Sequence, residues 1–449
     1  MMLLAELYRV RILSVFKHSY RSAIDRYYSA DAAQSTQDRP NPYLLNTHWT
    51  DASELAGHLF KRIVAVNEHF VIVDKPAGLS VWGHALSKLE ALKLLRPKCE
   101  TDGVPLSIKD CLPYLCKLIN DASSTGTFSQ NPVYTFSHLP DGINPPTSPS
   151  STIPKLYIAE SLPASYSGLI LLGRTEEYST AAQKFYRAAL KGKPPWRMYQ
   201  QFLAVCLNKP FTLCADNVRF PIGTFALNEH LHVGYRLPEG TPRRPKADGT
   251  VVLQKYVSHR SLIPNTMKSS LIELQTNSTF RGLPELYLLH EGCAVVGELL
   301  QSSRLVDTGI APVVLQPSQT KLNSEPPLWL RRLLGHPSFY DLPVHIHRTK
   351  LYIPAPIFYK SDKTNPIHFT SILPTPRGQI CSSGQKTSSS FAGLSWTKLE
   401  DSEGVSSKPS YVLTCTSPWL PEYFPYTMER LGLKFDYTSW ISSGAQSAH

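Results

Sequence analysis

Hydrophobic and polar positions alternate along much of this chain with the two-residue period that is typical of half-buried strands. Residues 59–73 follow this alternation and predict a pair of strands, which ends in the turn Asp74–Gly78. Further strands are predicted at Gly168–Gly173, Gln200–Val205, Ala247–Val257 and Ser269–Leu274. Apolar residues at helical spacing predict helices at Leu86–Leu95, Ile108–Ile119 and Ser179–Lys191. The pattern therefore favours an α+β fold with a mainly antiparallel sheet and flanking helices.

Three segments interrupt this pattern and are rich in Ser, Thr and Pro. They lie at residues 123–154, 303–325 and 360–407. We interpret them as inserts in one domain that spans residues 59–435, because related motifs fall on both sides of each insert. Residues 29–58 then form a leader or linker, and residues 436–449 form a tail.

Residues 1–28 hold five Lys or Arg residues and two acidic residues, interspersed with Leu, Val and Phe. A helix of this segment would carry its cations on one side and its apolar residues on the other, which is the pattern of a mitochondrial presequence. Arg26-Tyr27-Tyr28-Ser29 resembles a matrix processing site. We expect cleavage after Tyr28 and location in the mitochondrial matrix. The alternatives are an ordinary basic helix and a disordered tail.

The formal net charge of the 449 residues is +11, which favours a polyanionic partner such as nucleic acid. No apolar run reaches the roughly 20 residues of a membrane helix, so no membrane span is expected. The eight cysteines form no Cys-x-x-Cys pair, which indicates buried reduced thiols. His345 and His347 share one face of a predicted strand, but no cysteine or acid stands at ligand spacing. We therefore favour packing over metal binding for these two histidines.

Four blocks follow one another along the chain. They are Val71–Leu79 (Val-Ile-Val-Asp-Lys-Pro-Ala-Gly-Leu), Ser161–Arg174 (with Tyr-Ser-Gly before an apolar run), Gln200–Val205 (Gln-Gln-Phe-Leu-Ala-Val) and Gly292–Glu298 (Gly-Cys-Ala-Val-Val-Gly-Glu). In this order they resemble the motifs Asn-Lys-Pro-x-Gly, Arg-Leu-Asp-x-x-Thr-Ser-Gly, Lys-x-Tyr-Leu-Ala and Gly-x-Pro-Ile-Val-Gly-Asp of the RluA-like pseudouridine synthases.

The carboxyl-terminal part of the chain extends this resemblance. Leu342–Arg348 is similar to the Leu-His-Ala strand of the family, and Ser417–Phe424 is similar to its closing Ala-Pro-Leu-Pro-x-x-Phe segment. The resemblance covers residues 59–435. It implies a pseudouridine synthase fold with a central RNA-binding cleft.

The family isomerises uridine in RNA to pseudouridine without a cofactor, on a base flipped out of its stack. The resemblance implies that an aspartate acts at C1′ of the sugar, a tyrosine stacks on the base, and an arginine orients the aspartate. Pro163, Phe202 and Glu285 stand at these positions, so none of the three catalytic groups is intact. Arg281 is the arginine nearest to the third position.

Other carboxylates are possible substitutes for the missing aspartate. Glu160 lies three residues before Pro163, and a rearranged loop would have to bring it to the sugar. Asp216 and Glu298 are placed for turns or ion pairs.

Candidate RNA contacts, from the resemblance and from charge, are Lys75, His84, Phe202, Arg219, Arg243, Arg244 and Lys246. Lys75 ends a predicted strand, where the resemblance puts it near phosphate. The cluster Arg243-Arg244-Pro245-Lys246 suits non-specific phosphate contact, and a solvated loop is the alternative.

The sequence thus predicts an RluA-family homologue that binds mitochondrial mRNA or rRNA, with impaired or lost isomerisation, and needs neither cofactor nor metal. One alternative is an active pseudouridine synthase that uses a substitute acid. The other is a structural partner in mitochondrial ribosome assembly that no longer binds RNA directly.

Overall fold

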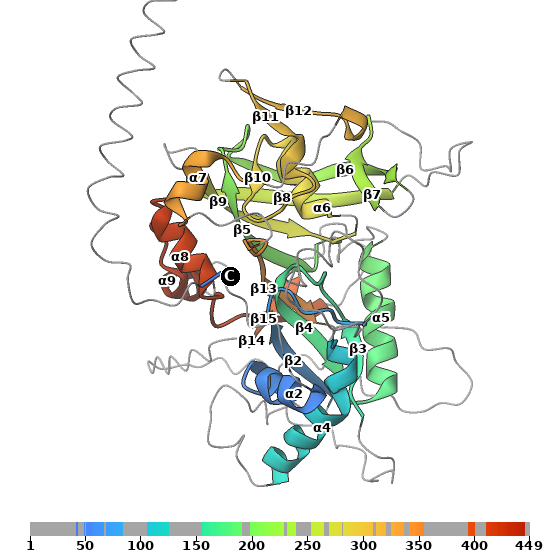
Figure 1. Ribbon diagram of the computed structural model, residues 1–449. Coiled ribbons are helices and arrows are strands. Elements are labelled where there is room, and N and C mark those ends of the chain that lie inside the picture. The colour runs from blue at the N-terminus through green and yellow to red at the C-terminus, as the bar shows by residue number, and fades with distance from the viewer. Residues whose placement is uncertain are drawn as a thin grey trace, which may run out of the picture.

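The computed structural model describes residues 42–43, 49, 51–66, 69–83, 106–124, 155–190, 198–228, 231–238, 253–264, 269–280, 282–308, 311–319, 325–335, 341–353, 394–399 and 410–444 (Figure 1). The predicted presequence 1–28 lies outside these residues, as do the predicted helix Leu86–Leu95 and most of the inserts 123–154 and 360–407. No helix among the described residues is long and apolar enough to cross a membrane.

Strands dominate the described part of the chain. They are β1 (Ile63–Val66), β2 (Phe70–Lys75), β3 (Tyr157–Glu160), β4 (Ser167–Gly173), β5 (Gln200–Leu207), β6 (Cys214–Asn228), β7 (Leu231–Arg236), β8 (Leu253–Pro264), β9 (Ser269–Thr276), β10 (Ala294–Val295), β11 (Leu305–Asp307), β12 (Pro312–Val314), β13 (Ile346–Ile353), β14 (Leu394–Leu399) and β15 (Ser410–Thr416). The helices are α2 (Ala52–Phe60), α4 (Ile108–Ser124), α5 (Glu176–Leu190), α6 (Leu283–His290), α7 (Leu328–Leu333), α8 (Tyr423–Arg430) and α9 (Tyr437–Gly444), with the short 3₁₀ helices η2 (Ser302–Arg304) and η3 (Pro317–Gln319).

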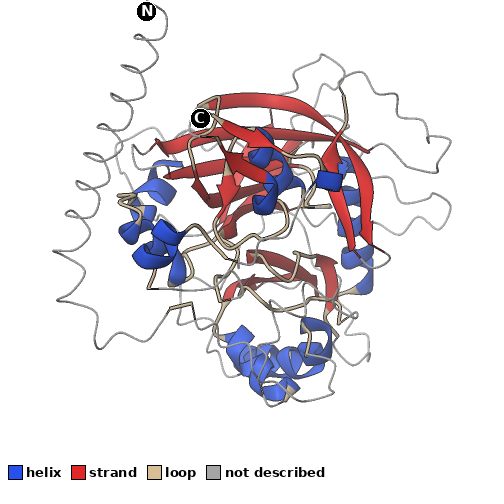
Figure 2. Cartoon of the chain, turned by 45° about the horizontal axis from the view of Figure 1, so that its top comes forward, coloured by secondary structure: helices blue, strands red, loops and turns tan. Residues whose placement is uncertain are grey.

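One large sheet runs through the molecule in the order β1-β2-β4-β13-β5-β9-β8-β6-β7, with helices on both sides of it (Figure 2). The pairing of β4 with β13 is parallel, and the other named strand pairs among the described residues are antiparallel. The α+β class with a mainly antiparallel sheet and flanking helices, predicted from the sequence, is confirmed.

Alternating residues of the central strands supply different hydrophobic cores. In β2, Val71 and Val73 face the core that contains α2, α4 and α6, whereas Phe70 and Ile72 face the core under α5. In β5, Phe202 and the following alternate residues belong to the first core, and Leu203 and its alternates pack with α7 and α8. Both faces of the sheet are covered, which explains why β4 is a continuous apolar run and is buried along its whole length.

Most elements with a clear period are where the sequence predicts them, in β1 and β2, β4, β5, β9, α4 and α5. Five of the described helices, α2, α6, α7, α8 and α9, are not among those that the sequence predicts. Residues 52–60 form α2, which Asp51 caps through Oδ1 by accepting from the backbone N–H groups of Ser53 and Glu54. Leu283–His290 forms α6, a two-turn helix that is buried almost all round and therefore has no amphipathic pattern to find.

The predicted insert 303–325 holds a small hairpin in its described part. Strands β11 and β12 pair with each other, apart from the main sheet. Arg304, which precedes β11, is 2% exposed and donates from Nη1 to the carbonyl of Gly234 in the edge strand β7, at 3.2 Å. Gln301 donates to the same carbonyl. The start of this segment thus covers part of a sheet edge.

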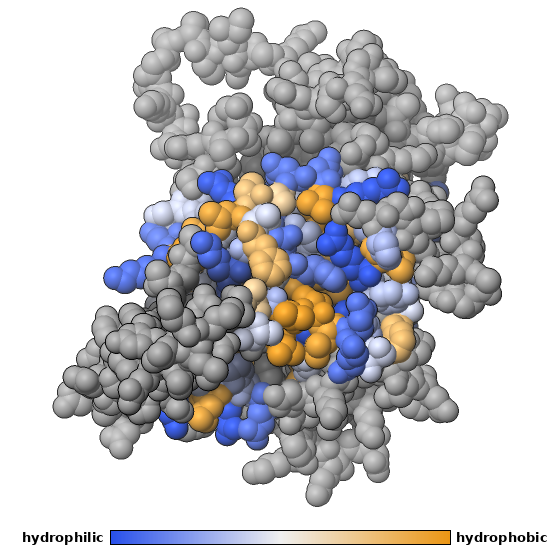
Figure 3. Space-filling view, turned by 90° about the horizontal axis from the view of Figure 1, so that it is seen from above, coloured by the Kyte–Doolittle hydropathy of each residue, from blue (hydrophilic) through white to orange (hydrophobic). Residues whose placement is uncertain are grey.

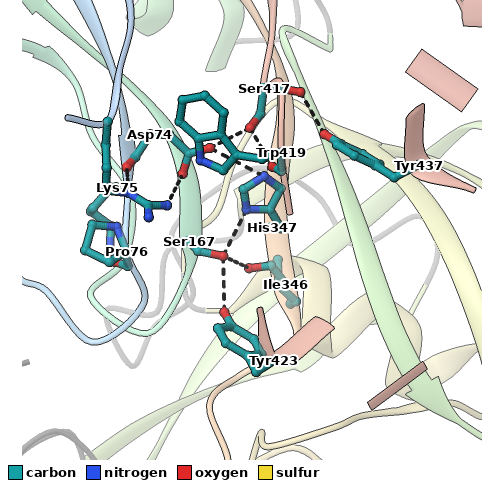
Figure 4. A network of polar contacts seen from close by, with 11 residues as sticks. Asp74, Lys75, Pro76, Ser167, Ile346, His347, Ser417, Trp419, Tyr423 and Tyr437 are labelled. Atoms are coloured by element: carbon teal, nitrogen blue, oxygen red, sulfur yellow. Dashed lines mark hydrogen bonds and ion pairs between the residues drawn. The ribbon is translucent and has the colours of Figure 1, made fainter. Parts of the chain in front are cut away.

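Buried polar groups join the end of β2 to the carboxyl-terminal part of the chain (Figure 4). Asp74, with no exposed surface, pairs with Arg62 at 3.1 Å and accepts a 2.5 Å hydrogen bond from Ser417 Oγ. The imidazole of His347 lies between Asp74, 3.8 Å from its Nε2, and Ser167 Oγ, 3.0 Å from its Nδ1. Burial outweighs the neighbouring carboxylate and lowers the pKa of His347 to about 4, so the imidazole is neutral at pH 7.

This burial makes stability depend on pH. In the unfolded chain His347 takes up a proton near pH 6.5, whereas in the folded chain it does so only near pH 4. The unfolded state therefore binds more protons as the pH falls from 6.5 towards 4, and the free energy of unfolding should drop by about 3 kcal/mol over this window. Urea unfolding at pH 7.5, 6.0, 5.0 and 4.0 measures the loss.

The His347→Gln variant provides the control, because it removes this titration. Its unfolding free energy should depend less on pH than that of the unmodified chain. His290, whose pKa burial also lowers to about 4, still contributes in the variant. An unchanged pH dependence in His347→Gln would contradict this role of His347.

Candidate functional site

A buried lysine positions the loop that carries Pro163. Lys75, at the end of β2, has no exposed surface, and its Nζ donates to the carbonyls of Pro76, Leu79 and Ala164 at 2.9–3.0 Å. The N–H of Gly78 donates to the same Ala164 carbonyl at 2.8 Å. Burial lowers the pKa of Lys75 well below its usual range, but only the ammonium form has the three N–H groups that these carbonyls accept from. The expected contact of Lys75 with RNA phosphate is therefore wrong.

A close backbone approach fixes the other end of this loop. Gly168 has a φ of +117° and pairs with Arg348 across the parallel β4–β13 register. A Cβ atom on Gly168 would stand 2.5 Å from the backbone N and O of Arg348. The glycine of the Ser-Gly pair in this segment is thus required by sheet geometry, independently of any chemistry.

Arg348 fills the place where two strands meet β4 on the same edge. β13 pairs with Ser167 and Gly168, and β3 pairs further along, from Leu171. Between them Arg348 donates to the carbonyl of Leu169 at 3.0 Å and to that of Ser161 at 2.9 Å. Its Nη2 also pairs with the carboxylate of Glu160 at 3.2 Å. Because the guanidinium has no exposed surface, this ion pair anchors the start of the Pro163 loop.

The carboxylate of Glu160 belongs to this buried cluster. Its side chain is 15% exposed, and it accepts a hydrogen bond from Tyr199 Oη at 3.4 Å. Burial raises the pKa of Glu160, while Arg348 and Tyr199 oppose the rise. The cluster brings a carboxylate, an arginine and a phenol together just before Pro163.

Tyr166 connects the three positions that stand for the catalytic residues of the family. Its backbone N–H donates to the carbonyl of Pro163 at 3.2 Å, and its ring meets Phe202 edge-on, with 5.9 Å between centroids. Its hydroxyl donates to Glu285, in the first turn of α6. Burial and the Glu285 carboxylate raise the pKa of Tyr166 well above its usual range, so the phenol stays protonated. The positions of Pro163, Phe202 and Glu285 are therefore brought together.

Only two of the remaining candidate RNA contacts lie among the described residues. Arg219 is exposed on β6. Phe202 has no exposed surface, contrary to the expectation that its ring is available for stacking. The predicted contacts His84, Arg243, Arg244 and Lys246, and also Arg281, lie outside the described residues. Seen from above, the described surface mixes hydrophobic and hydrophilic side chains, with hydrophobic ones in the middle of the view (Figure 3).

Glu298 and His345 have local structural roles, whereas Asp216 lies at the surface. Glu298, 8% exposed, accepts hydrogen bonds from the backbone N–H groups of Leu300, Gln301 and Ser302, and Asp216 is exposed. His345 is buried between the carbonyl of Pro343 and the hydroxyl of Thr427.

Neither the cysteines nor the metal-ligating residue types build a centre in the described ranges. The described cysteines are free thiols, and they are buried except for Cys214. Across these ranges no three His, Cys, Asp or Glu side chains are grouped to hold a metal ion.

Sequence reasoning did not single out Tyr166, Arg348 or Tyr199. Tyr166 stands at the threonine position of the Arg-Leu-Asp-x-x-Thr-Ser-Gly motif. A side chain so much larger than threonine could have indicated that the packing around this position differs from that in the family. Arg348 was visible only as the end of a resembling block, and its partner Glu160 lies 188 residues away. Such a distant pair leaves no local periodicity.

No protein-family model and no curated protein matches the chain. Among solved structures, it is similar to human RNA pseudouridylate synthase domain containing 4, with 16% identity and a TM-score of 0.45 over 86% of this chain and 98% of that one. It is also similar to human RNA pseudouridylate synthase domain containing 1, with 12% identity and a TM-score of 0.34 over 65% of this chain and 78% of that one.

The approach at Gly168 gives a stability test with a matched control. Gly168→Ala forces a Cβ into the backbone of Arg348 at a positive φ, and should lower the free energy of unfolding by roughly 2–4 kcal/mol. Gly57→Ala, inside helix α2 with nothing within 4 Å of the new Cβ, should raise it by about 1 kcal/mol. Chemical denaturation measures both. Equal small effects would contradict the close approach.

Proposed function

We propose that this chain is an RluA-type pseudouridine synthase homologue that binds mitochondrial RNA and has lost, or largely lost, uridine isomerisation. One observation supports this most directly. The loop that carries Pro163 is held by Lys75, Gly78 and Arg348, yet the residue it presents has no ionisable group. The framework of the site is kept while its acid is missing.

The residues at the other two catalytic positions, Phe202 and Glu285, also support a loss of isomerisation. Phe202 keeps an aromatic ring but has no hydroxyl to take part in proton transfer. Glu285 has the charge opposite to the family's arginine and accepts a hydrogen bond from Tyr166. A glutamate there would repel an aspartate at position 163 rather than orient it.

RNA binding is proposed from charge. The chain carries +11 overall, and phosphate contacts by lysine and arginine supply most of non-specific RNA affinity. Arg219 and the predicted contacts His84, Arg243, Arg244 and Lys246 are the proposed phosphate ligands, whereas Lys75 is excluded by its burial. We therefore expect binding that weakens steeply as salt is added.

The mitochondrial assignment rests on residues 1–28 and on the resemblance of the tail. We propose that these segments resemble those of the mitochondrial mRNA pseudouridine synthases of the RNA pseudouridylate synthase domain-containing protein 3 type. The RNA partner is accordingly proposed to be mitochondrial mRNA or rRNA.

A specific observation keeps an active enzyme as the second candidate. Glu160 is paired with Arg348 and accepts from the phenol of Tyr199, so a carboxylate, an orienting arginine and a tyrosine hydroxyl already lie together. Arg348 Cζ is also 5.8 Å from the ring centroid of Phe202. In this alternative Glu160 replaces the aspartate and modifies uridine in the same RNAs.

Release of the C5 hydrogen isotope from labelled uridine in mitochondrial transcripts tests both candidates. The unmodified mature chain should release none above background, because position 163 lacks a carboxylate. The triple variant Pro163→Asp, Phe202→Tyr, Glu285→Arg restores the family's three groups and should release isotope about 10²–10⁴-fold faster than background, the contribution typical of a positioned acid or base.

The single variant Pro163→Asp is the control, since its new carboxylate would face Glu285 without an arginine and should stay inactive. Release by the unmodified chain that disappears in Glu160→Gln would instead establish the second candidate. Thermal unfolding of each variant separates lost activity from lost folding.

Import provides the test of location. The full-length chain, tagged at its carboxyl terminus, should enter the mitochondrial matrix and be shortened to begin at Ser29, because the membrane potential draws in its basic amino-terminal segment. Replacing Arg9, Arg11 and Lys17 by Gln should abolish import. Fractionation and amino-terminal sequencing are the measurements, and an unprocessed cytosolic chain would refute the assignment.

A further inference from the structure

The large sheet has a partly exposed face on the side opposite to Phe202. Strands β6, β7, β8 and β9 form the end of the sheet farthest from β1 (Figure 1). In them Phe220, Val257 and Leu274 face the core that also contains Phe202 and α6. Successive residues of a strand point to opposite sides, so their neighbours face away from α6. We call this side the outer face, and its side chains include Arg219, Phe225, Tyr235, Tyr256, Arg260 and Glu273.

Tyr235 lies flat on the outer face. It stands opposite Gly223 in the β6–β7 ladder, and a Cβ atom on Gly223 would be 2.7, 2.8 and 3.0 Å from Cε1, Cζ and Oη of the tyrosine. Only glycine leaves room for the ring at this place. One side of the partly exposed ring therefore rests on the backbone, and the other side faces away from the sheet. Phe225, two residues after Gly223 on the same side, is 36% exposed.

Two arginines continue the row that these rings begin. Arg219, four residues before Gly223, is exposed and stands opposite Tyr256. Arg260, four residues after Tyr256 on β8, is also exposed. Because β6 and β8 are antiparallel, the row from Gly223 past Arg219 to Arg260 extends for roughly 26 Å. Aromatic rings and cations thus alternate along one side of the sheet.

The acids near this row do not cancel its positive charge. Glu273 is partly exposed opposite Arg260, and both Arg260 and Lys350 interact with its carboxylate. Asp216 is exposed in the bulge of β6. Arg219 stands opposite an aromatic ring rather than an acid. The outer face therefore keeps a small excess of positive charge, in a chain that carries +11 overall.

Alternating rings and arginines suit a single strand of nucleic acid. Unpaired bases stack on exposed aromatic rings, and arginines contact the phosphates between them. We propose that the outer face binds single-stranded RNA, with bases on Tyr235 and Phe225 and phosphates at Arg219 and Arg260. This inference rests on the proposed RNA-binding function. It adds a binding surface on the side of the sheet away from Phe202.

Fluorescence anisotropy with an unstructured single-stranded RNA and with a hairpin duplex of the same number of nucleotides tests the proposal. The mature chain should bind the single strand at least about fivefold more tightly, because bases in a duplex are stacked on one another. Tyr235→Leu and Phe225→Leu should each weaken single-strand binding by about 5–100-fold, the range that the stacking of one base provides. Gly223→Ala keeps the tyrosine but displaces its ring, and should weaken binding as well.

Arg219→Gln and Arg236→Gln form a matched pair, since each removes one positive charge. Arg236, on the neighbouring strand, points to the α6 side, with its Cζ 5.3 Å from the ring centroid of Phe220. Arg219→Gln should weaken single-strand binding and reduce the slope of log K against log salt by about 0.7, whereas Arg236→Gln should keep the unpaired-strand preference and the affinity. Phe211→Leu is the control for the rings, because Phe211 is 58% exposed but packs on Gly292, beside the end of α6.

The outcomes separate this inference from the proposed function. Salt-dependent binding that no outer-face variant weakens, or equal affinity for duplex and single strand, overturns the outer-face site and leaves RNA binding standing. Weakening by Arg236→Gln but not by Arg219→Gln also overturns it, in favour of the α6 side. Absence of salt-dependent binding to either RNA overturns the proposed RNA-binding function itself. Arg219→Gln changes an exposed side chain, so it decides the matter even where Gly223→Ala does not fold.

Discussion

Asp74 and Lys75, two adjacent buried charges at the end of β2, connect distant parts of the chain through their hydrogen bonds and ion pairs. Asp74 is neutralised by Arg62 and bonded to Ser417, so it ties the amino-terminal strands to the segment that follows the last strand. Lys75 donates hydrogen bonds to three carbonyls, one of them in the loop that carries Pro163. A buried charge is tolerated only when its partners are in place, so these residues couple the site loop, the sheet and the carboxyl-terminal helices. Four of the blocks that resemble a family in sequence meet here, namely Val71–Leu79, Ser161–Arg174, Leu342–Arg348 and Ser417–Phe424.

The hydrophobic periodicity of the sequence predicted those elements whose burial follows a regular local pattern. The apolar run of β4 and the alternation of β9 were visible because each strand faces a core on one or both sides. Helix α6 was not predicted because its eight residues are buried almost all round and show no amphipathic pattern. Gly282 precedes the helix and Pro284 lies in its first turn, and both residue types are typical of turns. The positions of Pro163, Phe202 and Glu285 were predicted from the resemblance alone. The burial of Lys75 and the pairing of Arg348 with Glu160 were beyond prediction, since both depend on groups brought from distant parts of the chain.

The replacements at the site are physically consistent with one another. An arginine at position 285 without an aspartate at position 163 would be a charge lacking its partner, which is costly in so enclosed a place. Glu285 with the hydroxyl of Tyr166 instead forms a bonded pair that leaves the phenol protonated. The loop is thereby held from the side of α6 as well as from the end of β2.

The parallel contact between β4 and β13 constrains how the chain can fold. Ser167 and His347 are neighbours in space but 180 residues apart in sequence, and β5 pairs with the same late strand. During synthesis, the edges of β4 and β5 that receive β13 stay open until residue 353 has been made, long after both strands exist. Such late closure is slow and leaves unpaired strand edges exposed to other chains. This topology therefore makes the chain prone to associate with other chains while its centre is incomplete.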